Sequence, residues 1–254
     1  MGLGIKSFED TLDFVKKHPK VLLLTLFPAL TYLPIALFQE TAPILLLMVL
    51  VSLPLFIFFS ILVAGAFPVI IQFELKSKKW NLKKAISISL RKFGKILIAN
   101  IFLILVFGIL FLIPIVILMF GASFYFTPLV ILSIILFLAL LIFTIFVSFR
   151  LSVVIPILVV EEKGVIESIK KSWKITKGHV LSIFVGLFLL SLIVTAITLP
   201  LNLLGIALNY FRLEEFYIVV NGVRSVISQT LISAFFNTFA SLFYFKLKSS
   251  GKKI

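Results

Sequence analysis

Long apolar runs alternate with short polar gaps along the whole chain. A helix needs about 20 residues to cross the hydrocarbon core of a bilayer. Six runs reach this length, and they cover residues 19–38, 43–73, 96–120, 126–149, 180–208 and 216–245. An apolar continuation to residue 160 leaves the end of the fourth run open. The pattern predicts an all-α polytopic bundle of six transmembrane helices, forming one integral membrane domain over residues 1–254.

Three of the polar segments show a helical period. Residues 161–178 read EEKGVIESIKKSWKITKG, and related stripes occur near residues 82–93 and 8–15. Asn81 suits a helix N-cap, while Gly94 and Gly178 suit helix ends. We expect two or three amphipathic helices lying at the membrane surface. Their apolar faces are, in chain order, Phe8, Leu12 and Val15; then Leu82, Ile86, Leu90 and Phe93; then Ile166, Ile169, Trp173 and Val180.

The basic faces of these helices allow two interpretations. In the first, they hold anionic lipid headgroups or a partner protein. In the second, they are connectors whose lysines only fix the topology and whose apolar faces pack on the bundle. For the first interpretation, the candidate contacts with lipid headgroups or a partner are Lys83, Lys84, Arg91, Lys92, Arg150, Lys170, Lys171, Trp173 and Lys174.

The same segments suggest an internal repeat. AISISLRKFGKIL at 85–97 aligns with SIKKSWKITKGHVL at 168–181 once one residue is inserted, and SFEDTLDFVKKH at 7–18 is a fainter third copy. The expected units are residues 5–77, 80–162 and 164–249, each an amphipathic helix followed by a transmembrane hairpin. All three units would run in parallel, whereas many transporters use inverted repeats.

Composition and charge then place the chain in a membrane. Hydrophobic residues make up 61% of the 254 positions, more than a soluble domain of this size encloses. Twenty-one of the 24 Lys and Arg lie in the two terminal segments and in the connections after the second and fourth runs. Because basic residues stay on the cytoplasmic side, we expect a multi-pass protein of the cell membrane with both termini cytoplasmic. This distribution also argues against a nucleic-acid partner.

Two arginines lie within or beside the apolar runs, where ionisable residues are costly. Arg150 either snorkels to the interface or pairs with Glu161, Glu162 or a lipid phosphate. Arg224 lies deeper, in a span that carries a polar residue at every fourth position. That stripe either lines a path with Arg224 as an anion-binding group or joins helices together; no other span shows a matching stripe, and Asn100, Thr195 and Thr198 stand alone. The candidate intramembrane polar site is Asn221, Arg224, Gln229 and Asn237.

Residues typical of catalysis are missing from the spans. Both histidines, His18 and His179, lie in the basic segments, and the chain has no cysteine. This excludes thiol chemistry and argues against histidine–carboxylate metal sites within the bilayer. No glycine-rich nucleotide loop is present. We therefore predict no catalytic residue, no metal, no cofactor and no enzymatic activity.

RLSVVIPILVVEEKGVIESIKKSWKITKGH, residues 150–179, resembles the membrane domain attached to some glycerophosphodiester phosphodiesterases and its stand-alone bacterial and archaeal relatives. SLFYFKLK at 241–248 is similar to the exit of that domain's last span. The resemblance implies the six-span fold. It implies no phosphodiesterase activity, since the sequence shows no soluble catalytic domain. The positions that carry it are Arg150, Pro156, Glu161, Ser168, Ser172, Trp173, Lys174 and Gly178.

Together these features predict a non-enzymatic membrane protein that binds lipid headgroups or serves as a scaffold for a membrane or cytoplasmic partner. The alternative is a small transporter or permease component with a polar path along the sixth span.

Overall fold

The computed structural model describes residues 2–37 and 42–250, which form helices and no strand. The all-α fold class is therefore confirmed. The helices are α1 (Gly2–Lys17), α2 (Lys20–Leu37), α3 (Ala42–Leu75), α4 (Leu82–Ser123), α5 (Thr127–Leu151), α6 (Val154–Val160), α7 (Val165–Ile175), α8 (Val180–Tyr210) and α9 (Glu214–Ser250).

Five stretches are long and apolar enough to cross a membrane: Leu46–Leu75, Leu82–Ser123, Thr127–Val160, Val180–Tyr210 and Glu214–Ser250. They correspond to the second to sixth predicted spans. The first predicted span coincides with α2, in which Lys20–Thr31 is a shorter apolar helix, and residue 38 lies outside the described residues. The fourth apolar stretch continues to Val160, with a break in the helix between Leu151, where α5 ends, and Val154, where α6 begins.

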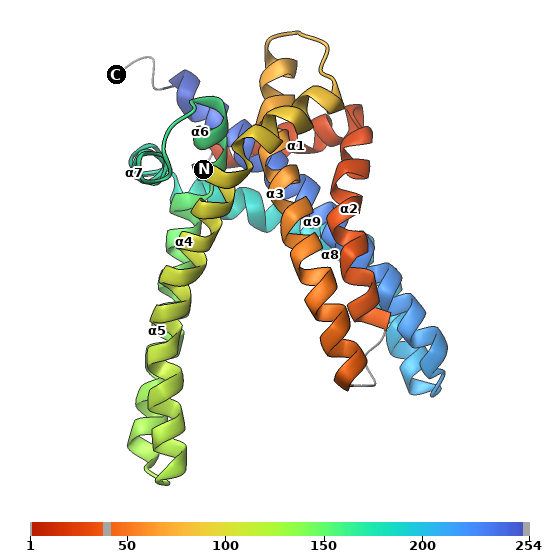
Figure 1. Cartoon of the computed structure of the whole chain (residues 1–254), viewed down its shortest axis with the longest axis vertical. Coiled ribbons are helices and arrows are strands. Elements are labelled where there is room, and N and C mark those ends of the chain that lie inside the picture. The colour runs from red at the N-terminus through yellow and green to blue at the C-terminus, as the bar shows by residue number, and fades with distance from the viewer. Residues whose placement is uncertain (1, 38–41, 251–254) are drawn as a thin grey trace.

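The helices diverge from one common end into two arms (Figure 1). The α4–α5 hairpin forms one arm, and α2, α3, α8 and α9 form the other. Helices α1, α6 and α7, the α3–α4 connection and the last turns of α9 lie at the common end, called the basic end below. The α4–α5 and α8–α9 connections lie at the far ends of the two arms.

The packed core lies toward the basic end. By contrast, only 6% of an 18-residue apolar segment of α4 is buried, against 50% of the corresponding segment of α9. The α4–α5 arm therefore exposes apolar side chains over most of its surface, as a lipid-facing hairpin does. The largest fully enclosed side chains of the core include Phe67, Ile70, Ile71, Ile157, Leu158, Phe239, Phe243 and Tyr244.

One predicted helix boundary is wrong. Asn81 does cap α4, accepting a hydrogen bond from the Lys83 backbone nitrogen over 2.8 Å, but the helix continues through Gly94 to Ser123. Glycine costs a helix interior only about 1 kcal/mol, and the strong helix formers around it carry the helix into the span. The second amphipathic segment is thus the beginning of α4, and α1 and α7 are the two separate amphipathic helices. Gly178, by contrast, has the left-handed φ of 82° expected after a helix end.

Candidate functional site

The α7 helix packs on the protein through its hydroxyl groups. Ser168, Ser172 and Thr176 are fully enclosed. The Ser172 hydroxyl donates to the backbone oxygen of Arg150 over 2.8 Å. The Thr176 hydroxyl is shared between that oxygen, at 3.0 Å, and the Ser172 backbone oxygen, at 2.7 Å. The Arg150 oxygen belongs to the last turn of α5, where carbonyls lack partners within their own helix. These two side chains therefore cap α5 and hold α7 against it.

Because its hydroxyl face is buried, α7 turns apolar side chains outward. Ile166 is 65% exposed and Trp173 is 41% exposed, and Lys170, three residues before Trp173, is exposed too. The interpretation in which the apolar face packs on the bundle is wrong for these two residues. It is confirmed at α1, where Phe8 and Leu12 pack against the core. The α7 helix thus presents an aromatic and basic surface to its surroundings.

Arg150 lies beneath this surface. Its side chain is buried, with the guanidinium carbon 4.5 Å from the centre of the Trp173 ring. Its Nε is enclosed and has no hydrogen-bond partner, and none of the ion pairs among the described residues involves Arg150. The predicted carboxylate partners, Glu161 and Glu162, bind lysines instead. The guanidinium therefore has an aromatic neighbour and no anionic one.

Glu161 joins three segments at the basic end. Its carboxylate accepts from Lys171 of α7 over 2.5 Å and from the Tyr244 hydroxyl of α9 over 2.7 Å. Lys163 and Lys248 lie within 3.8 Å. Burial raises the pKa of Glu161, but the hydrogen bonds and the charges of Lys171 and Lys248 outweigh it, so the pKa lies below the usual carboxyl range. This carboxylate is ionised and structural near neutral pH.

The nine predicted headgroup contacts fall into two groups. Lys92 and Lys171 form ion pairs within the protein. Lys92 lies 2.7 Å from the Glu162 carboxylate, and Lys171 binds Glu161. The hydrogen bond and charge of Lys92 also hold the pKa of Glu162 below its usual range. The second group has no recorded ion pair within the described residues and consists of buried Arg150 and exposed Lys83, Lys84, Arg91, Lys170 and Lys174, with Trp173 beside them.

A basic cavity between α1, α2 and α4 was missed in the sequence. Its volume is about 500 Å³. Trp80 has no periodic partner, so nothing in the sequence marked it. The cavity's positive charge is partly compensated, because Lys17 and His18 lie 2.8 and 3.1 Å from the Glu74 carboxylate. Its lining residues are Lys17, His18, Pro19, Lys20, Trp80, Asn81 and Leu82.

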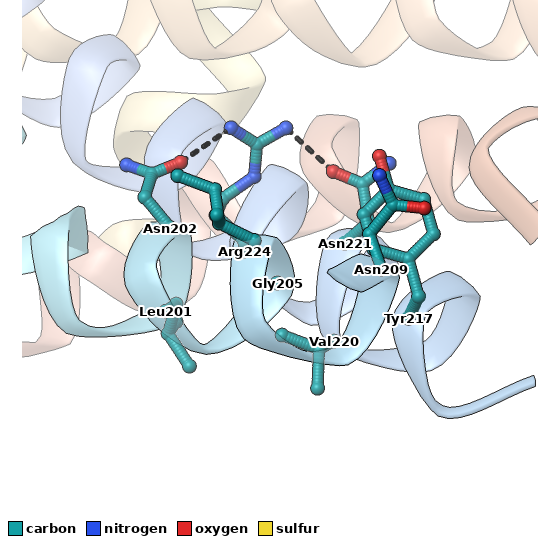
Figure 2. Close-up of a pocket in the computed structure, with 9 residues that line it drawn as sticks. Leu201, Asn202, Gly205, Asn209, Tyr217, Val220, Asn221 and Arg224 are labelled. Carbon is teal, nitrogen blue, oxygen red and sulfur yellow. Dashed lines mark hydrogen bonds between the residues drawn. The ribbon is translucent and has the colours of Figure 1, made fainter. Parts of the chain in front are cut away.

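Toward the far end of the second arm, Arg224 joins α8 to α9 (Figure 2). Its Nη1 donates to Asn202 Oδ1 over 2.7 Å, and its Nη2 donates to Asn221 Oδ1 over 2.5 Å. A cavity of about 180 Å³ lies on one side of the guanidinium, and a second of about 230 Å³ adjoins it. The first is lined by Leu201, Asn202, Gly205, Ile206, Asn209, Tyr217, Val220, Asn221 and Arg224, and the second by Thr198, Arg224, Ser225, Ser228 and Gln229.

The prediction that no other span matches the polar stripe of α9 is wrong. On α8, Thr198, Asn202 and Asn209 line the cavities beside Arg224. Their spacings of four and seven residues place them on one helical face, and the intervening leucines concealed this signal. Of the four residues predicted for the intramembrane site, three line these cavities. The fourth, Asn237, lies 13 residues from Arg224, about 20 Å along the helix, and its amide donates to the Ser233 backbone oxygen.

Comparison with known proteins adds a family without a defined role. Residues 5–247 match the model of a family described as a domain of unknown function (DUF7847). No curated protein and no solved structure matches the chain. Inference about function therefore starts from the side chains around Arg150 and Arg224.

Proposed function

We propose that this chain, a member of the DUF7847 family, binds anionic lipid headgroups. In this proposal its basic end lies on the cytoplasmic side of the cell membrane and makes the contact. The proposed role is non-enzymatic. A membrane or cytoplasmic partner protein would bind at the same basic end.

The observation that carries the proposal is the Arg150–Trp173 stack. A buried guanidinium without a carboxylate is costly unless an anion from outside completes it. The indole face compensates part of the charge, worth about 0.5–2 kcal/mol. Nε is enclosed and without a partner, whereas the two Nη groups are not in this state, and in this proposal they face the headgroups. Arginine presents these groups as a fork that matches a phosphate.

The surroundings of the stack suit the headgroup region. Tryptophan favours the membrane–water interface because its ring is apolar and its N–H is polar. Here Trp173 is exposed on α7 together with Ile166 and the ammonium group of Lys170. Each lysine near an anionic surface adds about 1 kcal/mol of attraction. Lys174, also exposed, adds a further charge at the same level.

The residues that form this stack are also those that carry the resemblance to phosphodiesterase-linked membrane domains. Arg150, Ser172 and Trp173 lie in one cluster, and Gly178 ends the segment with its positive φ. In this proposal the motif serves to place a buried arginine beneath an exposed tryptophan at the interface.

A transporter with a polar path along α9 is the rival proposal. Such a path needs its polar groups to face a cavity. The Asn237 amide instead donates to Ser233, and the Ser241 hydroxyl donates to the Asn237 backbone oxygen. These bonds within one helix support a packing role for that part of the stripe.

The test uses the full chain in nanodiscs of phosphatidylcholine with increasing phosphatidylglycerol. Trp80 is replaced by Phe, so that Trp173 is the single fluorescent reporter. We expect the emission of Trp173 to change saturably with the anionic lipid, and native mass spectrometry to find retained phosphatidylglycerol. Arg150→Gln should weaken this binding about tenfold, as expected for losing a charge-assisted hydrogen-bonded pair.

Arg91→Gln is the charge-matched comparison, because Arg91 is an exposed arginine of the basic end and itself a candidate headgroup contact. It should lose only the attraction of one surface charge, a smaller loss than in Arg150→Gln. It removes the same charge without touching the stack. Equal losses from the two variants would show a diffuse charge effect and contradict a site at Arg150. Anion flux through liposomes that disappears in Arg224→Ala would favour the transporter.

A further inference from the structure

We propose that Arg224 is the centre of a second site, one that binds a phosphate-type oxyanion at the end of the molecule away from the basic end. This site lies between α8 and α9, near their connection (Figure 2). It shares no residue with the Arg150 stack, and either site can exist without the other.

The charge of Arg224 is not compensated within the described part of the chain. The ion pairs recorded there leave Arg224 out. Its partners are the neutral amides of Asn202 and Asn221. Arg224 lies nine residues past Glu215, about 14 Å along α9, at a depth where a lone cation is unfavourable. A bound anion would remove this cost.

The hydrogen bonds orient the guanidinium without saturating it. A guanidinium has five N–H groups and no acceptor. Two of the five go to Asn202 and Asn221, and three remain for a ligand. Because arginine can only donate, both amide oxygens must face it. In Figure 2 the Asn202 nitrogen points away from Arg224 while its oxygen points toward it.

The two cavities beside Arg224 offer space and further donors. They measure about 180 and 230 Å³, several times the roughly 30 Å³ that one water occupies in the liquid. None of the residues that line them is acidic. Side chains that can donate line both: Asn209 and Tyr217 the first, and Ser225, Ser228 and Gln229 the second. A site rich in donors and free of carboxylates selects an oxyanion over a cation.

A phosphate group at this position has two sources, a lipid of the adjoining leaflet or free phosphate from solution. The chemistry of recognition is the same for both, so the experiment has one arm for each. In the first, radiolabelled inorganic phosphate is titrated onto the full chain in phosphatidylcholine nanodiscs. In the second, phosphatidylglycerol retained from mixed nanodiscs is counted by native mass spectrometry in the Arg150→Gln background, which removes the other site.

We expect wild-type binding in at least one arm and a loss of about tenfold or more in Arg224→Gln. Arg212→Gln is the matched control, because Arg212 is exposed in the α8–α9 connection and lines neither cavity. Phosphate alone identifies a soluble anion, and lipid alone identifies a headgroup. Binding in neither arm, or equal binding in Arg224→Gln and wild type, overturns the proposal.

Asn209→Leu keeps the test decisive if Arg224→Gln does not fold. Asn209 lines the first cavity, and no side-chain hydrogen bond is recorded for it, so its replacement makes the cavity wall apolar without breaking the Arg224 bridge. We expect weaker anion binding with unchanged helical content by circular dichroism. Unchanged binding in this variant would place the ligand elsewhere.

Discussion

Arg150 lies at the basic end and Arg224 toward the far end of α9, and within the described residues neither has a carboxylate partner. Arg150 is buried against the Trp173 ring, on a helix end held by two hydroxyls. Arg224 is half-buried, and two amide oxygens from different helices hold it. One guanidinium is thus positioned by packing and the other by hydrogen bonds.

This difference in how the guanidinium is held predicts which substitutions disrupt each site. An aromatic face attracts any cation over it, so the Arg150 site depends on the ring and on the docking of α7. Two amide oxygens on opposite sides need a forked donor, so the Arg224 site depends on the geometry of both amides. Substitutions at the Trp173 ring should mainly weaken lipid binding, whereas substitutions that break the amide bridge of Arg224 should also lower stability.

The largest effect is expected for Asn202→Leu. It removes an acceptor from a charged donor, and hydrogen bonds to charged groups contribute about 1.5–3 kcal/mol. We expect the free energy of unfolding in detergent, followed by circular dichroism, to fall by about 2 kcal/mol, with lipid binding at the basic end unchanged. Asn209→Leu, which breaks no recorded side-chain bond, is the control. Similar losses in both variants would mean that the Arg224 bridge contributes little.

The next effect is expected for the double variant Ser172→Ala, Thr176→Val. Both hydroxyls donate to the Arg150 backbone oxygen, so either single change leaves one bond in place. The double change leaves a buried carbonyl without these donors, at a cost of about 1–3 kcal/mol. Thermal unfolding and phosphatidylglycerol retention should decline together. Ser191→Ala is the control, since that exposed hydroxyl bonds only within α8. Lipid retention that survives the double change would show that α7 need not dock.

A smaller effect is expected at the indole ring. Trp173→Leu removes the cation–π contact, worth about 0.5–2 kcal/mol, and should weaken phosphatidylglycerol retention several-fold with little change in unfolding. Trp173→Phe keeps an aromatic face and should retain most of the binding. If Leu and Phe behave alike, the ring face does not hold Arg150.

The smallest effect concerns pH. The folded-state pKa values of Glu161 and Glu162 lie below the ordinary carboxyl range, so their ion pairs stabilise the fold above the unfolded carboxyl pKa of about 4.3. This stability is lost as the pH falls through the lowered values. Unfolding temperatures measured from pH 7 down to 3 should decline less in Glu161→Gln, by an amount corresponding to about 1 kcal/mol or less. A parallel decline in wild type and variant would show that Glu161 does not contribute to the loss of stability in acid.

The Arg224 bridge contains no carboxylate, so Asn202→Leu should keep the full acid dependence of the unfolding temperature.

Some of these features follow from local sequence alone. The apolar runs predicted the long helices, because crossing a bilayer requires about 20 apolar residues whatever the packing. Asn81 and Gly178 predicted a cap and a turn, since a capping oxygen and a positive φ depend on a few neighbouring atoms. The basic segments predicted one charged end, and Arg150 and Arg224 were singled out by their cost in an apolar run.

Tertiary structure decided which groups meet. Periodicity gave α7 an apolar face but could not show that its hydroxyl face docks on α5 and turns Trp173 outward, because a helix with two suitable faces can pack through either. Asn202 became a partner of Arg224 only through the crossing of α8 and α9. The sequence alone thus determined the helices, the charged end and the two isolated arginines. The contacts that make those arginines into sites depend on residues up to 26 positions apart, and only the packed helices bring them within hydrogen-bond range.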